Sequence, residues 1–327
     1  MKRMESQLIE LLNINGVSGK EEEVREYLKP VLSELVDTVT VDAYGNLLGE
    51  LKCGNGKGST VLLSAHMDTV KGVMPDKKLV LENGSISADN GALGADDRAG
   101  IAIILTVLRN VKNLSFNGTI KISFSREEEI GCVGAGKINP EWYKGTDLAI
   151  IVDRRGSRDI VVGCSMAYCT NNVGEFMEDM SELLDMDYQC VEGGVSDAMA
   201  FAENGINSIN LSAGYYNEHT SKEFVVVSQM FDTAKLVLQA IALINDFSND
   251  FGKLEESNKW VENWYKNDSY GHYYEEEEED MWAEAYDSHG DVYVYELGKD
   301  VIIQQGNQEI RMSVSSMRAI LGQLNKK

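Results

Sequence analysis

The sequence predicts an α/β protein with a three-layer α/β/α core, built on a mostly parallel mixed sheet, and a small C-terminal module of β-strands and a helix. Three observations predict this class. Strand-like and helix-like patterns alternate over the first 250 residues, acidic and histidine side chains follow several of the predicted strands, and the composition changes near residue 250. Alternating strands and helices favour a parallel sheet covered by helices on both faces. In such folds, ligand sites form beyond the carboxyl ends of the strands.

The N-terminal region predicts two helices. Residues 4–12 form a short amphipathic pattern, and a second helical period follows in the apolar positions of residues 24–35. The segment from Ser18 to Glu21 has the spacing of a capping box and is expected to start that second helix. Pro30 falls inside the pattern and is expected to kink the helix.

The rest of the core region continues the alternation. A hairpin is expected around Asn83-Gly84, because this dipeptide suits a primed two-residue turn. In chain order we expect strands at 38–42, 46–51 and 60–65, the hairpin at 79–88, a helix at 98–111, strands at 119–124 and 147–153, helices within 171–185 and at 196–204, a strand at 206–212 and a helix at 228–247.

The C-terminal quarter of the chain differs from this pattern. Residues 253–290 are rich in Trp, Tyr and acidic residues, whereas 291–327 alternate like three strands followed by a helix. The sequence therefore predicts a domain at 1–250, an acidic aromatic linker or arm at 251–290 and an accessory β-strand and helix module at 291–327. The arm is expected to be a solvated linker, or alternatively to contact a protein partner, mediate self-association or cover the mouth of the functional site.

Charge and composition exclude several classes of partner. The 327 residues include 53 acidic and 30 basic ones, a net charge of -23. Such a balance argues against binding nucleic acid or an anionic membrane surface. The N-terminus resembles neither a signal peptide nor a membrane span, no later segment is expected to approach the length of a spanning helix, and the five scattered cysteines suit reduced thiols. These features predict a soluble cytoplasmic protein.

Potential metal ligands follow the predicted strands. His66 and Asp68 end one strand, Glu127, Glu128 and Glu129 follow another, and further candidates are Asp96, Asp97, Asp153 and His219. Each alone has an ordinary structural explanation, such as a helix cap for Asp96-Asp97 or a surface ion pair for Asp153. Together, at one edge of one sheet, they would bury like charges unless a cation lay among them. Imidazole and carboxylate ligands suit Zn²⁺, with Mn²⁺ or Co²⁺ as alternatives, so we expect two divalent ions.

The order of these motifs also resembles a known group of enzymes. The segments SAHMDTV, GADDRAGIA, FSREEEIG, IIVDRR, GGVSDAMAF and NEHTSKEFV occur in this order, within a similarity that covers residues 4–247 as a whole-domain pattern. The set is similar to the two-zinc exopeptidases, namely peptidase T, the glutamate carboxypeptidase relatives and the lidless zinc aminopeptidases. This resemblance implies a metallo-exopeptidase domain at 1–250 that hydrolyses short peptides with water activated by two metal ions.

The resemblance also implies roles for individual residues. Asp96 would bridge the two ions, and Glu128 would be the general base, with Asp68 orienting His66. Asp97 would support the bridge, and Glu127 would have no direct role. The expected metal ligands are His66, Asp96, Glu129, Asp153 and His219.

The sequence departs from the tripeptidase pattern in one respect. About forty residues separate Asp153 from GGVSDAMAF, too few for the lid and dimerisation domain of those relatives. Because the relatives' lids supply contacts to the substrate carboxylate and to the oxyanion, the sequence leaves open whether a substrate C-terminus is recognised. Tyr215 or Tyr216 is a candidate to replace the lid's oxyanion donor. The favoured function is an aminopeptidase acting on short peptides. The alternatives are an amidase or carboxypeptidase acting on N-acylated amino acids, or a non-catalytic scaffold or binding protein.

Overall fold

The structure, a computed structural model, describes residues 1–254, 292–297, 300–305 and 308–313. The chain divides into two compact units, Met1–Val261 and Glu262–Lys327, which are considered separately. The predicted arm beyond residue 254 and the predicted C-terminal helix lie outside the described residues. The three domain boundaries therefore stay predictions.

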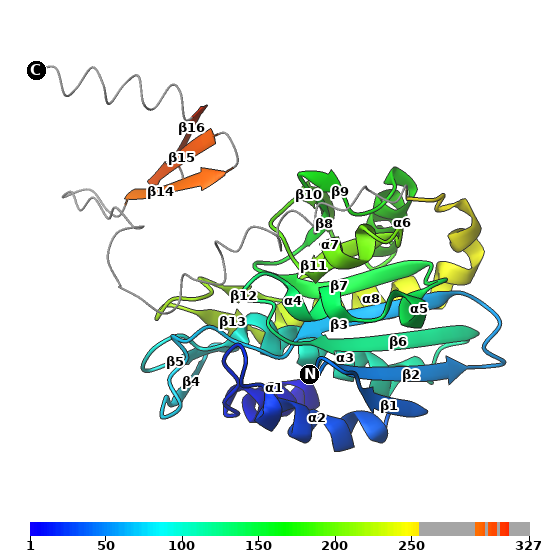
Figure 1. The fold of residues 1–327 in the computed structure, drawn as a ribbon, viewed down its shortest axis with the longest axis horizontal. Coiled ribbons are helices and arrows are strands. Elements are labelled where there is room, and N and C mark those ends of the chain that lie inside the picture. Colours follow the sequence, from blue (N-terminus) through cyan, green and yellow to red (C-terminus); the bar gives the residue numbers. More distant parts are fainter. Residues whose placement is uncertain (255–291, 298–299, 306–307, 314–327) are drawn as a thin grey trace, which may run out of the picture. The chain divides into compact units, whose positions relative to one another are not determined.

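A large mixed sheet forms the centre of the first unit (Figure 1). Its four central strands β6, β3, β7 and β11 run parallel, and antiparallel pairs flank them on both sides. The strand order is β1 (Thr38–Val41), β2 (Leu47–Cys53), β6 (Gly118–Ser125), β3 (Thr60–His66), β7 (Leu148–Arg154), β11 (Ser208–Ser212), β8 (Asp159–Cys164) and β10 (Gln189–Glu192), with β9 (Met166–Ala167) paired to β8. The predicted fold class is confirmed.

Helices cover both faces of this sheet and form two hydrophobic cores. Along β3, Val61 and Leu63 enter the first core and Leu62 enters the second, because successive strand residues point to opposite faces. The first core is covered by α1 (Lys2–Leu12), α2 (Glu22–Ser33), α3 (Ala95–Val111), α6 (Asn171–Glu182) and α8 (Val227–Phe247), which the short 3₁₀ helix η1 (Ser248–Asp250) follows. The second is covered by α4 (Val133–Lys137), α5 (Pro140–Tyr143) and α7 (Asp197–Ala202). The three predicted layers are thus present.

A second, antiparallel sheet joins segments that are far apart in the sequence. Its order is β12 (Tyr215–Tyr216), β13 (Phe224–Val226), β5 (Ser85–Ala88) and β4 (Leu79–Glu82). The β4–β5 hairpin turns through Asn83 and Gly84, whose φ values of 52° and 81° are those that a primed turn requires. The predicted hairpin is confirmed. In Figure 1 this sheet lies at the left, on the side where β3, β6 and β7 end.

The second unit contains three described strands. They are β14 (Val292–Leu297), β15 (Asp300–Gln305) and β16 (Gln308–Ser313), paired antiparallel in sequence order. The alternating pattern predicted these three strands.

The predicted capping box before the second helix is wrong. Helix α2 begins at Glu22 with Glu21 as its N-cap and has no side-chain cap. The hydroxyl of Ser18 instead donates to Asp68 Oδ2 at 2.8 Å, and the buried carboxylate of Glu21 pairs with Arg126 at 2.7 Å. Tertiary partners outweigh the local cap here because charge-assisted hydrogen bonds are stronger than neutral ones.

The expectation that no segment has the length of a membrane span is also wrong. The segment Val227–Asp250, which includes α8, is long and apolar enough by length and composition, and half of its most apolar window is buried. In the structure α8 packs against α3, and its side chains contribute to the first core. Core helices of soluble proteins share this composition.

Candidate functional site

Five predicted ligands meet at one edge of the large sheet. His66 is the last residue of β3, Glu129 follows β6, and Asp153 lies near the end of β7. Because β6, β3 and β7 are parallel neighbours, their carboxyl ends come together. Asp96 joins them from the first turn of α3, and His219 comes from the loop between β12 and β13.

Asp96 lies between the two histidines. Its Oδ1 is 3.0 Å from His66 Nε2, and its Oδ2 is 3.2 Å from His219 Nε2. His219 Nε2 is also 2.7 Å from Glu129 Oε2, while His66 Nε2 is 3.5 Å from Asp153 Oδ1. The donor atoms therefore form two groups that share one carboxylate, the arrangement that a bridging ligand needs.

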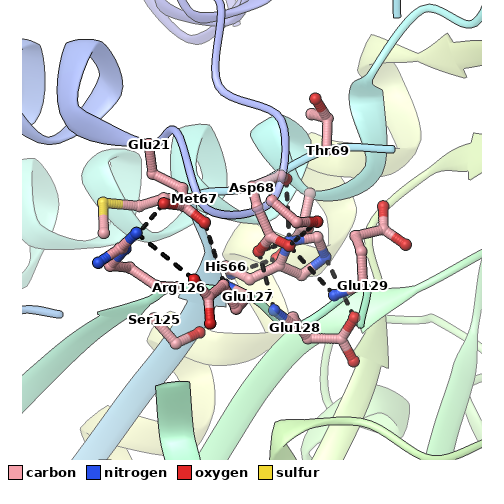
Figure 2. Close-up of polar contacts among 12 residues, drawn as sticks. Glu21, His66, Met67, Asp68, Thr69, Ser125, Arg126, Glu127, Glu128 and Glu129 are labelled. Atoms are coloured by element: carbon pink, nitrogen blue, oxygen red, sulfur yellow. Dashed lines mark hydrogen bonds and ion pairs between the residues drawn. The ribbon is translucent and has the colours of Figure 1, made fainter. Parts of the chain in front are cut away.

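Asp68 orients the neighbouring side chains rather than facing the shared carboxylate. One of its oxygens is 3.2 Å from His66 Nδ1, on the opposite side of the ring from Asp96. Its carboxylate also accepts the backbone N–H groups of Glu128 and Glu129, at 2.9 and 3.2 Å (Figure 2). Asp68 thus holds the strand end of β3 to the segment after β6.

Asp97 and Glu127 occupy supporting positions. Asp97 is fully buried and accepts hydrogen bonds from the backbone N–H groups of His66 and Gly100, at 3.2 and 3.0 Å. The Glu127 carboxylate turns away from the histidines and contacts Arg126 and the hydroxyl of Tyr44. Figure 2 shows Arg126 between Glu127 and the buried Glu21.

The charged side chains of this cluster strongly shift one another's pKa values. Burial favours neutral His66, but the carboxylates around it, Asp153 foremost, outweigh burial and raise its pKa well above 6.5. Burial raises the pKa of Glu129 to about 7 and that of Asp153 to about 6. His219 and His66 hold the pKa of Asp96 below its ordinary value despite burial. Opposing shifts within one small cluster are typical of functional sites.

The chemistry of these groups fits divalent metal ions. Sets of three donor atoms close enough to share one ion include His66, Asp96 and Glu129, as well as His66, Glu128 and Asp153. The second oxygen of Glu129 is buried without a hydrogen-bond partner. A cation would coordinate that oxygen and would offset the repulsion between the buried carboxylates. The described residues therefore contain candidate sites for divalent metals.

Glu128 has a separate environment that the sequence analysis missed. Its side chain is 12% exposed, and Oε1 accepts a hydrogen bond from the Cys132 thiol at 3.1 Å. Asp197 lies close to both of these groups, and one of its buried oxygens has no partner. Burial, with the charge of Asp153 adding to it, raises the pKa of Glu128 well above 4.5. Cys132 follows Glu128 by four residues in the sequence, and this spacing was the signal that could have indicated their contact.

Two further residues were missed because they act on backbone groups. Glu223 is buried, and its carboxylate accepts from the N–H groups of Gly94, Ala95 and Asp96 at 2.8, 2.7 and 3.1 Å. Arg98 is also buried and donates to the Met67 carbonyl beside the site. Glu223 follows His219 by four residues, but no sequence pattern indicates contact with the start of α3.

The tyrosines proposed as oxyanion donors have other partners. Tyr215 is buried, and its hydroxyl donates to Asp153 Oδ1 at 3.1 Å. Tyr216 donates to Gln229 and Ser157 at 2.9 and 3.3 Å and stacks on Phe224. Tyr215 therefore orients Asp153 in this structure, and the Tyr216 hydroxyl is held by Gln229 and Ser157.

The segment between β7 and α7, where some relatives carry a lid domain, is part of the main fold in this chain. The segment 155–196 folds into β8, β9, α6 and β10, which extend the large sheet and its helical layer. Within the described ranges, no additional domain is inserted there. This agrees with the short spacing seen in the sequence.

Comparison with protein families gives one match. The family model of the M42 glutamyl aminopeptidases matches residues 72–236, about half of the chain. This range includes Asp96, Glu129, Asp153 and His219, and it begins just after His66.

Comparisons with individual proteins find further similarities. The Bacillus subtilis protein YqjE is 35% identical over 146 residues, which are 41% of this chain and 38% of that protein. Peptidase T of Halothermothrix orenii is 36% identical over 102 residues, 30% of this chain and 24% of the relative. These matches span well under half of either relative. Among solved structures, the aminopeptidase PepT from Bacillus cereus has a TM-score of 0.67 at 20% identity and covers 74% of this chain and 98% of its own, which shows a shared fold.

Proposed function

The chain belongs to the M42 glutamyl aminopeptidase family, and from this premise we propose that it is a metal-dependent aminopeptidase that removes N-terminal residues from short peptides. The observation that carries the proposal is the position of Asp96. Its two oxygens are within 3.0 and 3.2 Å of imidazole nitrogens that come from two separate segments of the chain.

The five clustered side chains would hold two divalent ions. One ion would take His66, Asp153 and one oxygen of Asp96, and the other would take Glu129, His219 and the second oxygen of Asp96. Zinc suits this mixture of imidazole and carboxylate, with manganese or cobalt as alternatives. When bound, the ions supply Lewis acidity to the scissile carbonyl and lower the pKa of the attacking water.

Glu128 is the proposed general base. Its Oε2 is 3.9 Å from His66 Nε2, so this oxygen faces the cluster, while Oε1 is held by Cys132. A carboxylate in this position takes a proton from the attacking water at Oε2 and delivers it to the leaving amine. Asp68 keeps the His66 ring in place through Nδ1, which fixes the ring tautomer and its orientation.

The proposed substrates are short peptides with a free amino group, and the proposed location is the cytoplasm. We also propose that the chain self-associates or binds a protein partner through residues beyond 250. Nucleic acid and membrane surfaces are not proposed as partners, because the net charge of -23 would oppose them.

The test combines metal analysis with a substrate panel. Elemental analysis of the purified protein is expected to give about two zinc-like ions per chain. Hydrolysis of di- and tripeptides with free amino groups is expected to stop after treatment with a chelator and to return when zinc, manganese or cobalt is added. Cleavage of N-acylated peptides alone would overturn the aminopeptidase assignment and favour the amidase alternative.

A further inference from the structure

A second group of potential metal ligands shares Glu128 with the site described above. It consists of Glu128, Cys132 and Asp197, each of which offers one ligand atom within 4.8 Å of the other two. We propose that this group is a third metal site, which takes a thiophilic divalent ion such as Zn²⁺ when that ion is in excess and thereby blocks the proposed general base. The site is inferred from these three side chains, whereas the block of catalysis rests on the proposed function.

The fold brings the three residues together from neighbouring elements. Glu128 follows β6, Cys132 is the N-cap residue of α4, and Asp197 is the first residue of α7, which packs against α4. Two backbone hydrogen bonds fix the turn between the first two residues, because the N–H groups of Gly131 and Cys132 both donate to the Glu128 carbonyl at 2.8 Å. This turn places the Cys132 thiol 3.1 Å from Glu128 Oε1.

Asp197 supplies an oxygen that has no hydrogen-bond partner in the fold. Its side chain is 1% exposed, and Oδ2 accepts a hydrogen bond from the hydroxyl of Ser125. Oδ1 is buried and makes no hydrogen bond. A buried carboxylate oxygen without a partner is costly, so such a group indicates a missing ligand. A cation between Asp197, Cys132 and Glu128 would coordinate this oxygen and offset the repulsion between the two carboxylates.

The donor types select the kind of ion. A thiolate is a soft ligand that favours Zn²⁺ over Mg²⁺ or Ca²⁺, and one sulfur with two oxygens leaves the fourth position of a tetrahedral ion open for water. Binding releases the thiol proton of Cys132 to solvent, because the thiolate is the ligand. The five proposed ligands of the two-metal site include no sulfur, so a metal–sulfur bond would distinguish the third site from the other two.

Glu128 connects the third site to the proposed reaction. Its Oε1 faces Cys132, while its Oε2 is 3.9 Å from His66 Nε2. A carboxylate that coordinates an ion is no longer a free proton acceptor for the attacking water. The Glu128 side chain is 12% exposed, so the group is not sealed from solvent. Excess zinc is therefore expected to inhibit peptide hydrolysis through this residue.

The binding test uses Co²⁺ as a spectroscopic probe. Holoenzyme is titrated with Co²⁺, because a cobalt–thiolate bond gives a charge-transfer band in the near ultraviolet that imidazole and carboxylate ligands do not give. We expect the wild type to show this band and to bind about one further ion per chain. Cys132→Ser keeps a hydroxyl donor for Glu128 but removes the sulfur, and it is expected to lose both the band and the further ion.

Two further variants complete the binding test. Asp197→Asn keeps the sulfur and is expected to bind Co²⁺ at least about 10-fold more weakly, since even a lost contact to a metal ligand weakens metal binding about 10- to 100-fold. Cys53→Ser is the matched control and should keep the band. Cys53 is also a buried free thiol, but it pairs with Gly118 at the start of β6, whereas Glu128 follows the end of that strand.

The activity test measures inhibition by zinc added beyond the two proposed ions. Each rate is compared with the rate of the same protein before the addition, so an effect of the substitution on basal activity cancels. The zinc concentration that halves the rate is expected to rise by at least about 10-fold in Cys132→Ser and in Asp197→Asn. Cys53→Ser should match the wild type.

The outcomes separate the site from its effect. A band that is absent from the wild type, or that persists in Cys132→Ser, would overturn the metal site. Equal inhibition by zinc in the wild type and in Cys132→Ser would overturn the block of Glu128. If the wild type hydrolyses no peptide, the proposed function fails, and a cobalt band that is lost in Cys132→Ser would still support the third site.

Discussion

Replacing Gly100 by alanine tests how the site depends on close packing. Gly100 lies in α3, where its N–H donates to Asp97. A Cβ at this position would be 2.0 Å from the Val152 carbonyl oxygen of β7 and 2.5 Å from Asp97 Oδ1. Val152 directly precedes Asp153, so the added methyl group would press on the strand that carries a proposed ligand.

The expected magnitude follows from these distances. The new contact with the Val152 oxygen would be about 1.4 Å shorter than the 3.4 Å at which ordinary contact begins. The oxygen belongs to a central strand and cannot rotate away, so helix and strand must separate. Overpacking of a core costs about 1–3 kcal/mol of unfolding free energy. A displacement of about 1 Å at a catalytic site can also cost about 100-fold in rate.

The assay compares Gly100→Ala with Gly72→Ala. A Cβ at Gly72 would lie 3.9 Å from its nearest neighbour, Ala92, which is an ordinary contact. Gly100→Ala is expected to lower the denaturant midpoint, the bound metal per chain and kcat/KM together, whereas Gly72→Ala should resemble wild type. Wild-type metal content and activity in Gly100→Ala would refute the packing argument.

Four other changes have definite expected outcomes. Glu128→Gln should lower kcat by about 100- to 10,000-fold with unchanged metal content, because general base catalysis contributes this much; comparable activity would point to a different base. Ser18→Ala removes one hydrogen bond from Asp68 and no core contact, so it should affect kcat/KM, measured by kinetics, more strongly than it affects the free energy of unfolding, measured by denaturation; a lower unfolding free energy with an unchanged kcat/KM would contradict this. Glu223→Ala should lower the unfolding free energy by at least about 2 kcal/mol in urea titrations, because three buried N–H groups lose their acceptor; no change would show that water replaces the carboxylate. Removing metal with a chelator should lower Tm, since ligand binding stabilises the native state and the buried carboxylates would then repel one another; an unchanged Tm in calorimetry would argue against ions at this cluster.

Much of the fold was predictable because its signals are local. The alternation of helical and strand patterns gave most of the large sheet and its helices, and Asn83-Gly84 marked the hairpin. The strands β8, β9, β10, β12 and β13 were not expected. The hairpin could be seen in the sequence, but its pairing with β13 depends on contacts between segments more than a hundred residues apart.

Residues at strand ends were predictable in the same way. The parallel order of β6, β3 and β7 brings their carboxyl ends to one edge, so the metal-ligand types that follow them converge. Supporting residues such as Ser18, Cys132 and Glu223 were not predictable, because each acts through a tertiary contact with no fixed spacing. Ser18 shows the difficulty well, since its sequence context favours a helix cap and the fold uses its hydroxyl for Asp68.

The most direct test of the central claim is an anomalous difference map from crystals of the full chain grown with zinc. Two peaks are expected, one on each side of the Asp96 carboxylate. The first should lie about 2.0–2.2 Å from ligand atoms of His66 and Asp153, and the second at similar distances from Glu129 and His219. A map in which zinc lies elsewhere, or in which these five side chains contact no ion, would contradict the proposed metal site.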